Sequence, residues 1–123
     1  MNWWFVAAAL LAAFTCVVHV IFGGREAARP LLAASDLDQV ARFTNYYCWH
    51  LVTIAIAALA AAFAYASLNT AATDLALFAS GVAIVFALWD VVMIAKFSLP
   101  VMQFAQWALF LPIGMLGGIG VFA

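Results

Sequence analysis

Charged side chains are scarce in this sequence: only 7% of its 123 residues are Asp, Glu, Lys or Arg, and the formal net charge is −1. A soluble domain carries about 25% charged residues. The chain therefore has too few polar side chains to cover a water-facing surface, which argues against a soluble globular enzyme or a disordered segment. The lack of a basic excess also argues against a nucleic-acid-binding module, so nucleic acid is not an expected partner.

Motifs of soluble catalytic chemistry are missing as well. The chain contains no G-x-G-x-x-G or G-K-[ST] phosphate-binding loop and no H-E-x-x-H metal motif. The alternating apolar pattern of transmembrane β-strands is absent. What the sequence has instead is a hydrophobic fraction of 71%, arranged in long continuous runs. This composition predicts an all-α integral membrane protein that is surrounded by the lipid bilayer.

Four apolar runs are long enough to be membrane spans, since a spanning helix needs about 20 apolar residues. They cover about residues 3–22, 46–67, 75–97 and 101–122. Short connections make successive helices run in opposite directions. The expected fold is therefore an antiparallel bundle of four transmembrane helices, which forms a single membrane domain over residues 1–123.

The only substantial polar segment, residues 25–44, separates the first two runs. The Gly23–Gly24 pair before it is expected to end the first helix, since glycine commonly follows a helix C-terminus. Pro30 is expected to interrupt any helix in the segment. Ser35 and Asp36 are N-cap residue types, so a helix is expected to start there and run into the second span. We expect a short interfacial helical segment on the membrane surface between the first two spans.

All basic residues fall on one side of the expected bundle. They lie in the connection between the first two spans or at the end of the third span: Arg25, Arg29, Arg42 and Lys96. Lys and Arg are enriched in cytoplasmic loops of membrane proteins. We therefore expect a multi-pass protein of the bacterial inner (cytoplasmic) membrane, with the first connection inside and both termini outside.

Polar side chains within the spans gather in the half of the membrane nearest to the basic connection. They come from all four spans and the adjoining connection: His19, Glu26, His50, Asp90, Gln103 and Gln106. At 1.5 Å per residue, His19 and His50 each lie about 6 Å inside the expected boundary of a span, and Asp90 lies about 10 Å inside on the same side. Because polar groups in hydrocarbon are costly, this cluster is the best indication of a functional site.

Three chemistries, besides simple hydrogen bonding between helices, are open for this cluster. His19 and His50 are candidate axial ligands of haem b, because two imidazoles on neighbouring helices can hold one iron. His19, His50 and Asp90 are candidate ligands of a transition metal such as zinc or iron, with Glu26 as a further donor. The same groups suit a quinone or a proton path, because an imidazole exchanges protons near neutral pH.

Small residues form a recognisable pattern in the last apolar run. Gly114 and Gly118 make a G-x-x-x-G motif, and Gly117 and Gly120 lie close by. Small residues at this spacing allow membrane helices to approach each other closely. The motif predicts packing between helices of the same chain, and dimerisation is the alternative.

The region around the first connection resembles a pattern in uncharacterised small bacterial integral membrane proteins with four helices. The resemblance rests on the run from His19 to Glu26 (HVIFGGRE), the run RPLL at 29–32, Arg42, and the Trp49–His50 pair. In that group a first-helix His is followed by Gly and Glu, and an Arg and a Trp-His pair open the second helix. The resemblance covers about residues 19–50. It implies a four-helix fold and a set of candidate residues, and it implies no activity.

With no soluble domain and no nucleotide motif, we expect a small non-enzymatic membrane protein. It would serve as an accessory or scaffold subunit of a larger bacterial membrane complex, with other integral membrane subunits or a second copy of itself as partners. Two alternatives stay open. One is a haem- or metal-binding, quinone-linked redox module built on His19 and His50. The other is a small oligomeric transporter in which Asp90 binds a cation or proton.

Overall fold

Every regular element of the protein is a helix in the computed structural model, which describes residues 1–123. The elements are α1 (Trp3–Val18), the π-helix η1 (His19–Ala28), α2 (Arg29–Ala33), α3 (Gln39–Leu68), the 3-10 turn η2 (Thr70–Ala72), α4 (Thr73–Phe97) and α5 (Trp107–Phe122). Three continuous helices are long and apolar enough to cross a membrane: Trp3–Ala33, α3 and Thr70–Phe97. α5 is apolar but has only 16 residues. The expected all-helical class is confirmed, and the helices are compatible with a multi-pass membrane protein.

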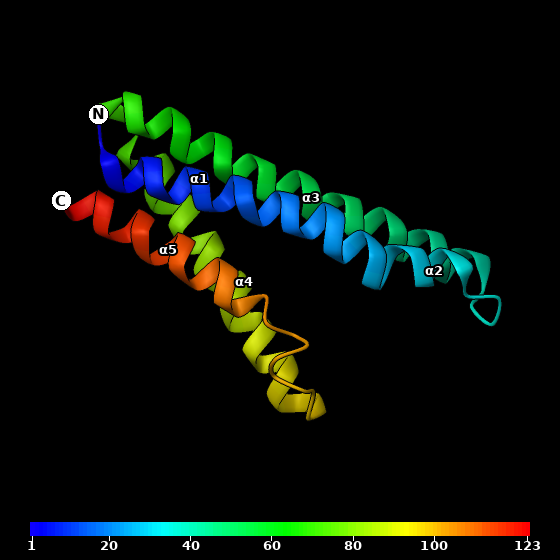
Figure 1. The fold of residues 1–123 in the computed structure, drawn as a ribbon. Helices are drawn as coiled ribbons and strands as arrows, with labels where there is room; N and C mark the ends of the chain where they lie inside the picture. The colour runs from blue at the N-terminus through cyan, green and yellow to red at the C-terminus, as the bar shows by residue number, and fades with distance from the viewer.

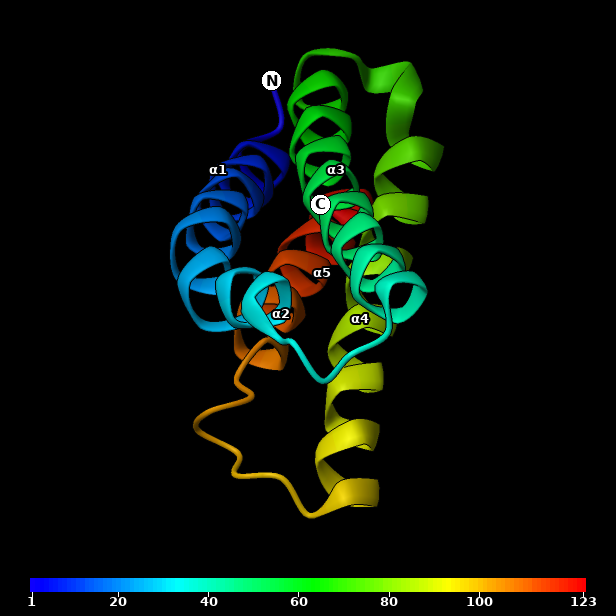
Figure 2. The same ribbon diagram turned by 90° about the vertical axis from the view of Figure 1, so that its right-hand side faces the viewer.

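The helices form two arms that meet at one end of the molecule (Figure 1). α1 and α3 lie side by side, α4 packs on α5, and α5 also contacts α1. The arms join where both chain termini lie and diverge away from them, as the view at 90° also shows (Figure 2). We call the joined region the packed end. We call the diverging region the open end, and it comprises η1, α2 and residues 34–55 of one arm and residues 88–106 of the other.

The hydrophobic core lies at the packed end. Its members are Phe5, Ala8, Ala12, Ile56, Leu59, Phe63, Ala66, Ala76, Ala79, Ala83, Ala87, Phe110 and Ile113. No residue of α3 before Ile56 and none of α4 after Ala87 is buried. Most of the core residues are alanine, which lets helix backbones approach closely. Such close approach is how helices associate when the surrounding lipid is as apolar as their side chains.

α5 packs against its neighbours through three glycines. A Cβ atom added at Gly114, Gly117 or Gly120 would lie 2.6 Å or less from a side chain of another helix. Gly118, in contrast, has no such atom within 4 Å. The G-x-x-x-G motif therefore contributes Gly114 to packing within the chain, whereas Gly118 faces outward.

Asn2 connects three helix ends at the packed end. Its side-chain oxygen accepts hydrogen bonds from the backbone N–H groups of Trp4 at 3.1 Å and Phe5 at 3.4 Å, so Asn2 caps α1. Its side-chain amide donates to the carbonyl oxygen of Gly120 at 2.7 Å. Its backbone N–H donates to the carbonyl oxygen of Ser67 at 3.0 Å. One residue thus links the start of α1 to the ends of α3 and α5.

The expected helix stop at Gly23–Gly24 is wrong. The first helix passes through both glycines as η1 and continues through α2 to Ala33. Neither glycine has the positive φ that ends a helix at a glycine. The hydrogen bonds widen instead, as in the bond from the Arg29 N–H to the Gly24 carbonyl five residues earlier. The helix also continues through Pro30, so the expectation that this proline interrupts it is wrong.

The connection between the first two long helices is shorter than expected. Only residues 34–38 lie outside helices, and Ser35 and Asp36 belong to this loop rather than to a helix start. α3 begins at Gln39, after Asp38, whose side chain makes no capping hydrogen bond. The predicted separate short helix is therefore absent, because α2 continues the first long helix. That this connection lies on the membrane surface stays a prediction.

The last helix begins at Trp107 and not near residue 101. α4 ends where Ser98 adopts a left-handed conformation with a φ of 51°, and Pro100 follows two residues later. Proline restricts the residue before it to extended backbone, which prevents the helix from resuming at once. Gln103 and Gln106 therefore lie in turns that precede α5, and the expectation that they occupy its first turns is wrong.

Candidate functional site

A cleft of about 350 Å³ lies at the open end, lined by residues of α1, η1, α3, α5 and the segment before α5. Its polar lining residues are Thr15, His19, Glu26, Gln103 and Gln106. Its larger apolar lining residues are Val18, Phe22, Val52, Ile56, Met102, Leu109 and Phe110. The cleft therefore brings together four of the six polar residues that the sequence singles out, and it leaves out His50 and Asp90.

His19 is held in one orientation by Trp49. The Nε2 atom of His19 lies 3.3 Å from the backbone carbonyl oxygen of Trp49. Because a carbonyl oxygen only accepts, Nε2 carries the proton and donates it. In a neutral ring the Nδ1 atom is then a free acceptor. The imidazole also stacks on the Trp49 indole, with ring centroids 4.7 Å apart and an interplanar angle of 21°.

Trp49 is the centre of an aromatic cluster that comprises His19, Tyr46, Trp49 and His50. The Tyr46 ring stacks parallel to the indole at 6.3 Å, and the His50 ring meets the indole edge-on at 5.0 Å. The Gly23–Gly24 pair runs past the indole, where an added Cβ would lie 3.7 to 4.0 Å from ring atoms. His50 is exposed and does not line the cleft. The two histidines thus share a tryptophan but do not share the cleft.

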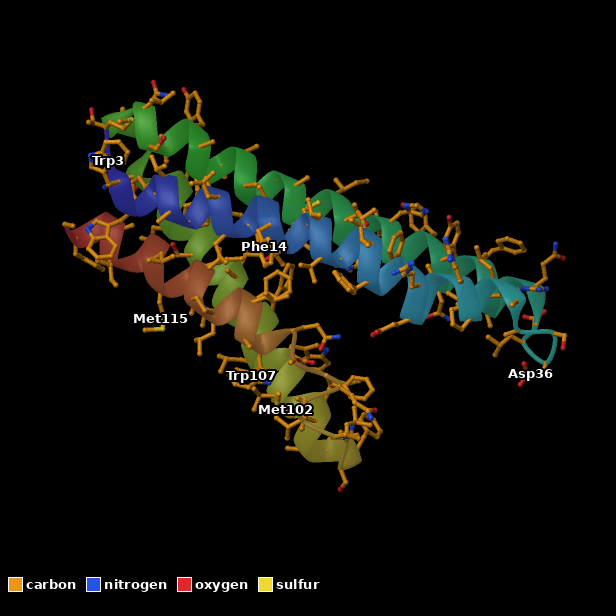
Figure 3. All side chains as sticks on the ribbon, in the orientation of Figure 1. Trp3, Phe14, Asp36, Met102, Trp107 and Met115 are labelled. Atoms are coloured by element: carbon orange, nitrogen blue, oxygen red, sulfur yellow. The ribbon has the colours of Figure 1, made fainter.

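Asp90 holds the start of α5. Its Oδ2 atom accepts a hydrogen bond from the backbone N–H of Trp107 at 2.9 Å. With the Gln106 amide turned so that its nitrogen faces the carboxylate, that nitrogen donates to Oδ1 at 3.1 Å. A carboxylate in this place caps the helix and interacts favourably with the positive end of its dipole. Asp90 therefore acts from α4 as the cap of α5, and Figure 3 labels Trp107 at this junction.

The metal-ligand set expected from the sequence is not assembled. No group of three or more His, Cys, Asp or Glu side chains lies close enough together to hold a metal ion. Asp90 is bonded to the start of α5, and His50 lies outside the cleft that His19 lines. The structure therefore does not bring His19, His50 and Asp90 into one group, and metal binding stays a prediction. Haem ligation by His19 and His50 stays a prediction, and both imidazoles already pack against Trp49.

The cleft has one feature that sequence reasoning missed. The backbone N–H groups of Val101, Met102, Ala105 and Gln106 have no backbone acceptor in the chain. Val101, Met102, Phe104 and Ala105 continue the apolar run toward α5, so the interruption of the helix is signalled only by Pro100 and the two glutamines. Met102, Ala105 and Gln106 also line the cleft. Three of the four residues with unpaired backbone N–H groups therefore belong to the lining of the cleft, to which η1 contributes His19 and Glu26.

Comparison with known proteins leaves these residues as the only basis for a functional inference. No protein-family model, curated protein or solved structure matches this chain. The resemblance of residues 19–50 to small four-helix membrane proteins therefore stays a prediction.

Proposed function

We propose that this chain is a multi-pass protein of the bacterial inner membrane and a non-enzymatic accessory or scaffold subunit of a larger membrane complex. The length and hydropathy of three helices support membrane insertion. In this proposal all four long elements cross the bilayer as an antiparallel bundle. α5 would be about 24 Å long at 1.5 Å per residue, so it crosses together with the turns before it.

The distribution of basic residues supports an orientation with both termini outside. Arg25, Arg29, Arg42 and Lys96 all belong to the open end, whereas both termini lie at the packed end (Figure 1). Basic residues are retained on the cytoplasmic side. Alkaline phosphatase, which is active only outside the cytoplasm, should be active when fused after Ala123. Activity of a cytoplasm-only reporter at the same position would contradict this orientation.

The observation that carries the accessory role is the incomplete packing of the open end. No residue of α4 from 88 to 97 is buried, and the backbone N–H groups of Val101, Met102, Ala105 and Gln106 are unpaired.

At 1.5 Å per residue, Asp90 lies about 26 Å from the start of α4, inside a hydrocarbon core about 30 Å thick. The turns that end beside Asp90 therefore reach into the core. Backbone groups at that depth need protein or water neighbours, because lipid chains offer no hydrogen bonds. A transmembrane helix of a partner, packed along the exposed residues 88–97 of α4, would shield these turns from lipid. Since its own backbone groups are hydrogen-bonded internally, it would bond the N–H of Val101 through a polar side chain.

Two exposed positions on one face of α4 test this role. Trp89 lies at the open end and Phe78 at the packed end, with exposed fractions of 65% and 71%. They are 11 residues apart, which is about three helical turns, so they point in nearly the same direction. A photo-cross-linking amino acid is placed at each position, and the tagged protein is purified gently from native membranes.

We expect a larger membrane protein to co-purify in fixed stoichiometry and to form an adduct with the position 89 variant. The position 78 variant serves as the matched control and should form that adduct much less. The accessory role would be contradicted if the chain purified alone, if adducts formed only with a second copy, or if both positions reacted equally.

A further inference from the structure

The cleft at the open end has an apolar part and a polar part. Val18, Phe22, Val52, Ile56, Leu109 and Phe110 form the apolar part. The polar part contains His19, Glu26 and the two glutamines of the segment before α5. Such a site suits an amphiphile, because its polar group can reach the hydrogen-bonding residues while its apolar body contacts the hydrophobic ones.

The side chains of the polar part offer acceptors. Glu26 carries the only formal charge in the lining, which has no Lys or Arg. The Nε2 proton of His19 is used by the Trp49 carbonyl, so its Nδ1 atom can only accept. The amide nitrogen of Gln106 is used by Asp90, which leaves its carbonyl oxygen. The side-chain donors of His19 and Gln106 are thus already used within the protein, so N–H groups and a positive charge on the ligand suit this side of the cleft.

The segment before α5 has the opposite character. The backbone N–H groups of Met102, Ala105 and Gln106 are donors without a backbone acceptor. Ester and phosphate oxygens are the acceptors that backbone N–H groups bind in many anion sites. The nearby carboxylate of Asp90 is already hydrogen-bonded by two N–H donors, which reduces its repulsion of such oxygens. The cleft therefore offers acceptors from η1 and backbone donors from the segment before α5, which suits a group that carries both an ammonium and phosphate oxygens.

We propose that the cleft binds the head group of a zwitterionic, ethanolamine-type phospholipid. The ammonium lies beside Glu26 and the Nδ1 atom of His19, and the phosphodiester oxygens lie near residues 102–106. A volume of about 350 Å³ is at the small end of ligand sites, so it takes the head group and leaves the acyl chains to the bilayer. This site is separate from the accessory role, because a protein partner would cover the outer face of α4.

Competition between lipids tests the proposal directly. The purified protein is mixed with equal amounts of phosphatidylethanolamine, phosphatidylcholine and phosphatidylglycerol, and bound lipid is measured by native mass spectrometry. Phosphatidylcholine keeps the phosphate and the charge but has no N–H donor, and phosphatidylglycerol has no cation. We expect phosphatidylethanolamine to be retained several-fold over both. Equal retention of the three lipids would overturn the proposal.

Free phosphoethanolamine distinguishes a lipid from a soluble ligand with the same head group. It lacks the apolar body that contacts Val52, Ile56 and Leu109. It should therefore displace the lipid only at a large excess. Displacement at equal concentration would show that the acyl part contributes nothing and would overturn the assignment to a membrane lipid.

Two variants locate the bound lipid. Glu26→Gln should reduce the preference for phosphatidylethanolamine over phosphatidylglycerol about fivefold, the scale of one charge-assisted hydrogen bond near water. Asp36→Asn removes the same charge at the tip of the 34–38 loop, away from Met102 in the cleft, and should leave the preference unchanged (Figure 3). His19→Phe keeps a ring against Trp49 and should reduce the discrimination against phosphatidylcholine. Unchanged preferences in both Glu26→Gln and His19→Phe would overturn the proposal.

Discussion

The two ends of the molecule are built from different residues. The packed end consists of alanine and glycine with a few large side chains such as Phe63, and its helices touch along their backbones. The open end carries the basic residues, the aromatic cluster and the cleft, and its helices diverge. Both ends are strongly apolar, so hydrophobicity does not distinguish them. In this protein the buried small residues lie where the helices join, as expected when helices associate through close packing.

The largest effect is expected from filling the closest contact of the packed end. The Cβ of Gly117→Ala would lie 2.5 Å from a ring carbon of Phe63 and even closer to the Ser80 hydroxyl. Phe63 is fully buried and has no room to move. We expect a loss of about 2–3 kcal/mol in the free energy of unfolding, as for other overpacked cores. Unfolding by SDS in detergent micelles, followed by circular dichroism, measures this value.

The neighbouring glycine provides the matched control. Gly118→Ala adds the same methyl group where nothing lies within 4 Å. It should leave the free energy of unfolding unchanged or raise it by up to about 1 kcal/mol, because alanine favours helix more than glycine does. Equal losses in both variants would show that the packed end does not depend on close approach of α5.

The second effect concerns Asn2. Asn2→Ala removes the cap of α1 and the hydrogen bond to the Gly120 carbonyl. We expect a loss of about 1–2 kcal/mol in the free energy of unfolding, which is the usual range for a lost N-cap with one further hydrogen bond. Asn69→Ala is the control, since the exposed Asn69 side chain bonds only to the Tyr65 carbonyl of its own helix. A smaller loss for Asn2→Ala than for the control would contradict the linking role.

The third effect is at Asp90, on the border between the two ends. Asp90→Ala leaves the Trp107 N–H without its acceptor and should cost about 0.5–2 kcal/mol in the same unfolding measurement. Asp90→Asn keeps an oxygen acceptor for that N–H and should cost less. If the two variants were equally destabilised, the charge rather than the cap would be the important property of Asp90.

Sequence reasoning located the four apolar helices, though not all of their ends, because long apolar runs are evident in hydropathy. It placed the two histidines, Asp90 and the two glutamines in one half of the bundle, with Glu26 in the adjoining connection. The structure gathers His19, Glu26 and the two glutamines in one cleft. It did not exclude His50, since rotation about a helix axis is not evident in hydropathy. The late start of α5 was missed for a related reason. Val101 and Met102 are as apolar as the residues of α5, and glutamines such as Gln103 and Gln106 are compatible with the first turns of a helix, so the pattern does not distinguish turns from a helix start.

The smallest effect tests whether the open end lacks close packing. A Cβ added at Gly23 would lie 3.7 Å from both the His19 Nδ1 and the Trp49 Nε1 atoms, which is ordinary contact. Its φ is not positive, so alanine fits the backbone. Gly23→Ala should therefore raise the free energy of unfolding by about 0.5–1 kcal/mol, the reverse of the Gly117→Ala effect. A loss of similar size would show that the π-helix needs glycine to pass Trp49. The open end would then be as tightly packed around its tryptophan as the other end is around Phe63.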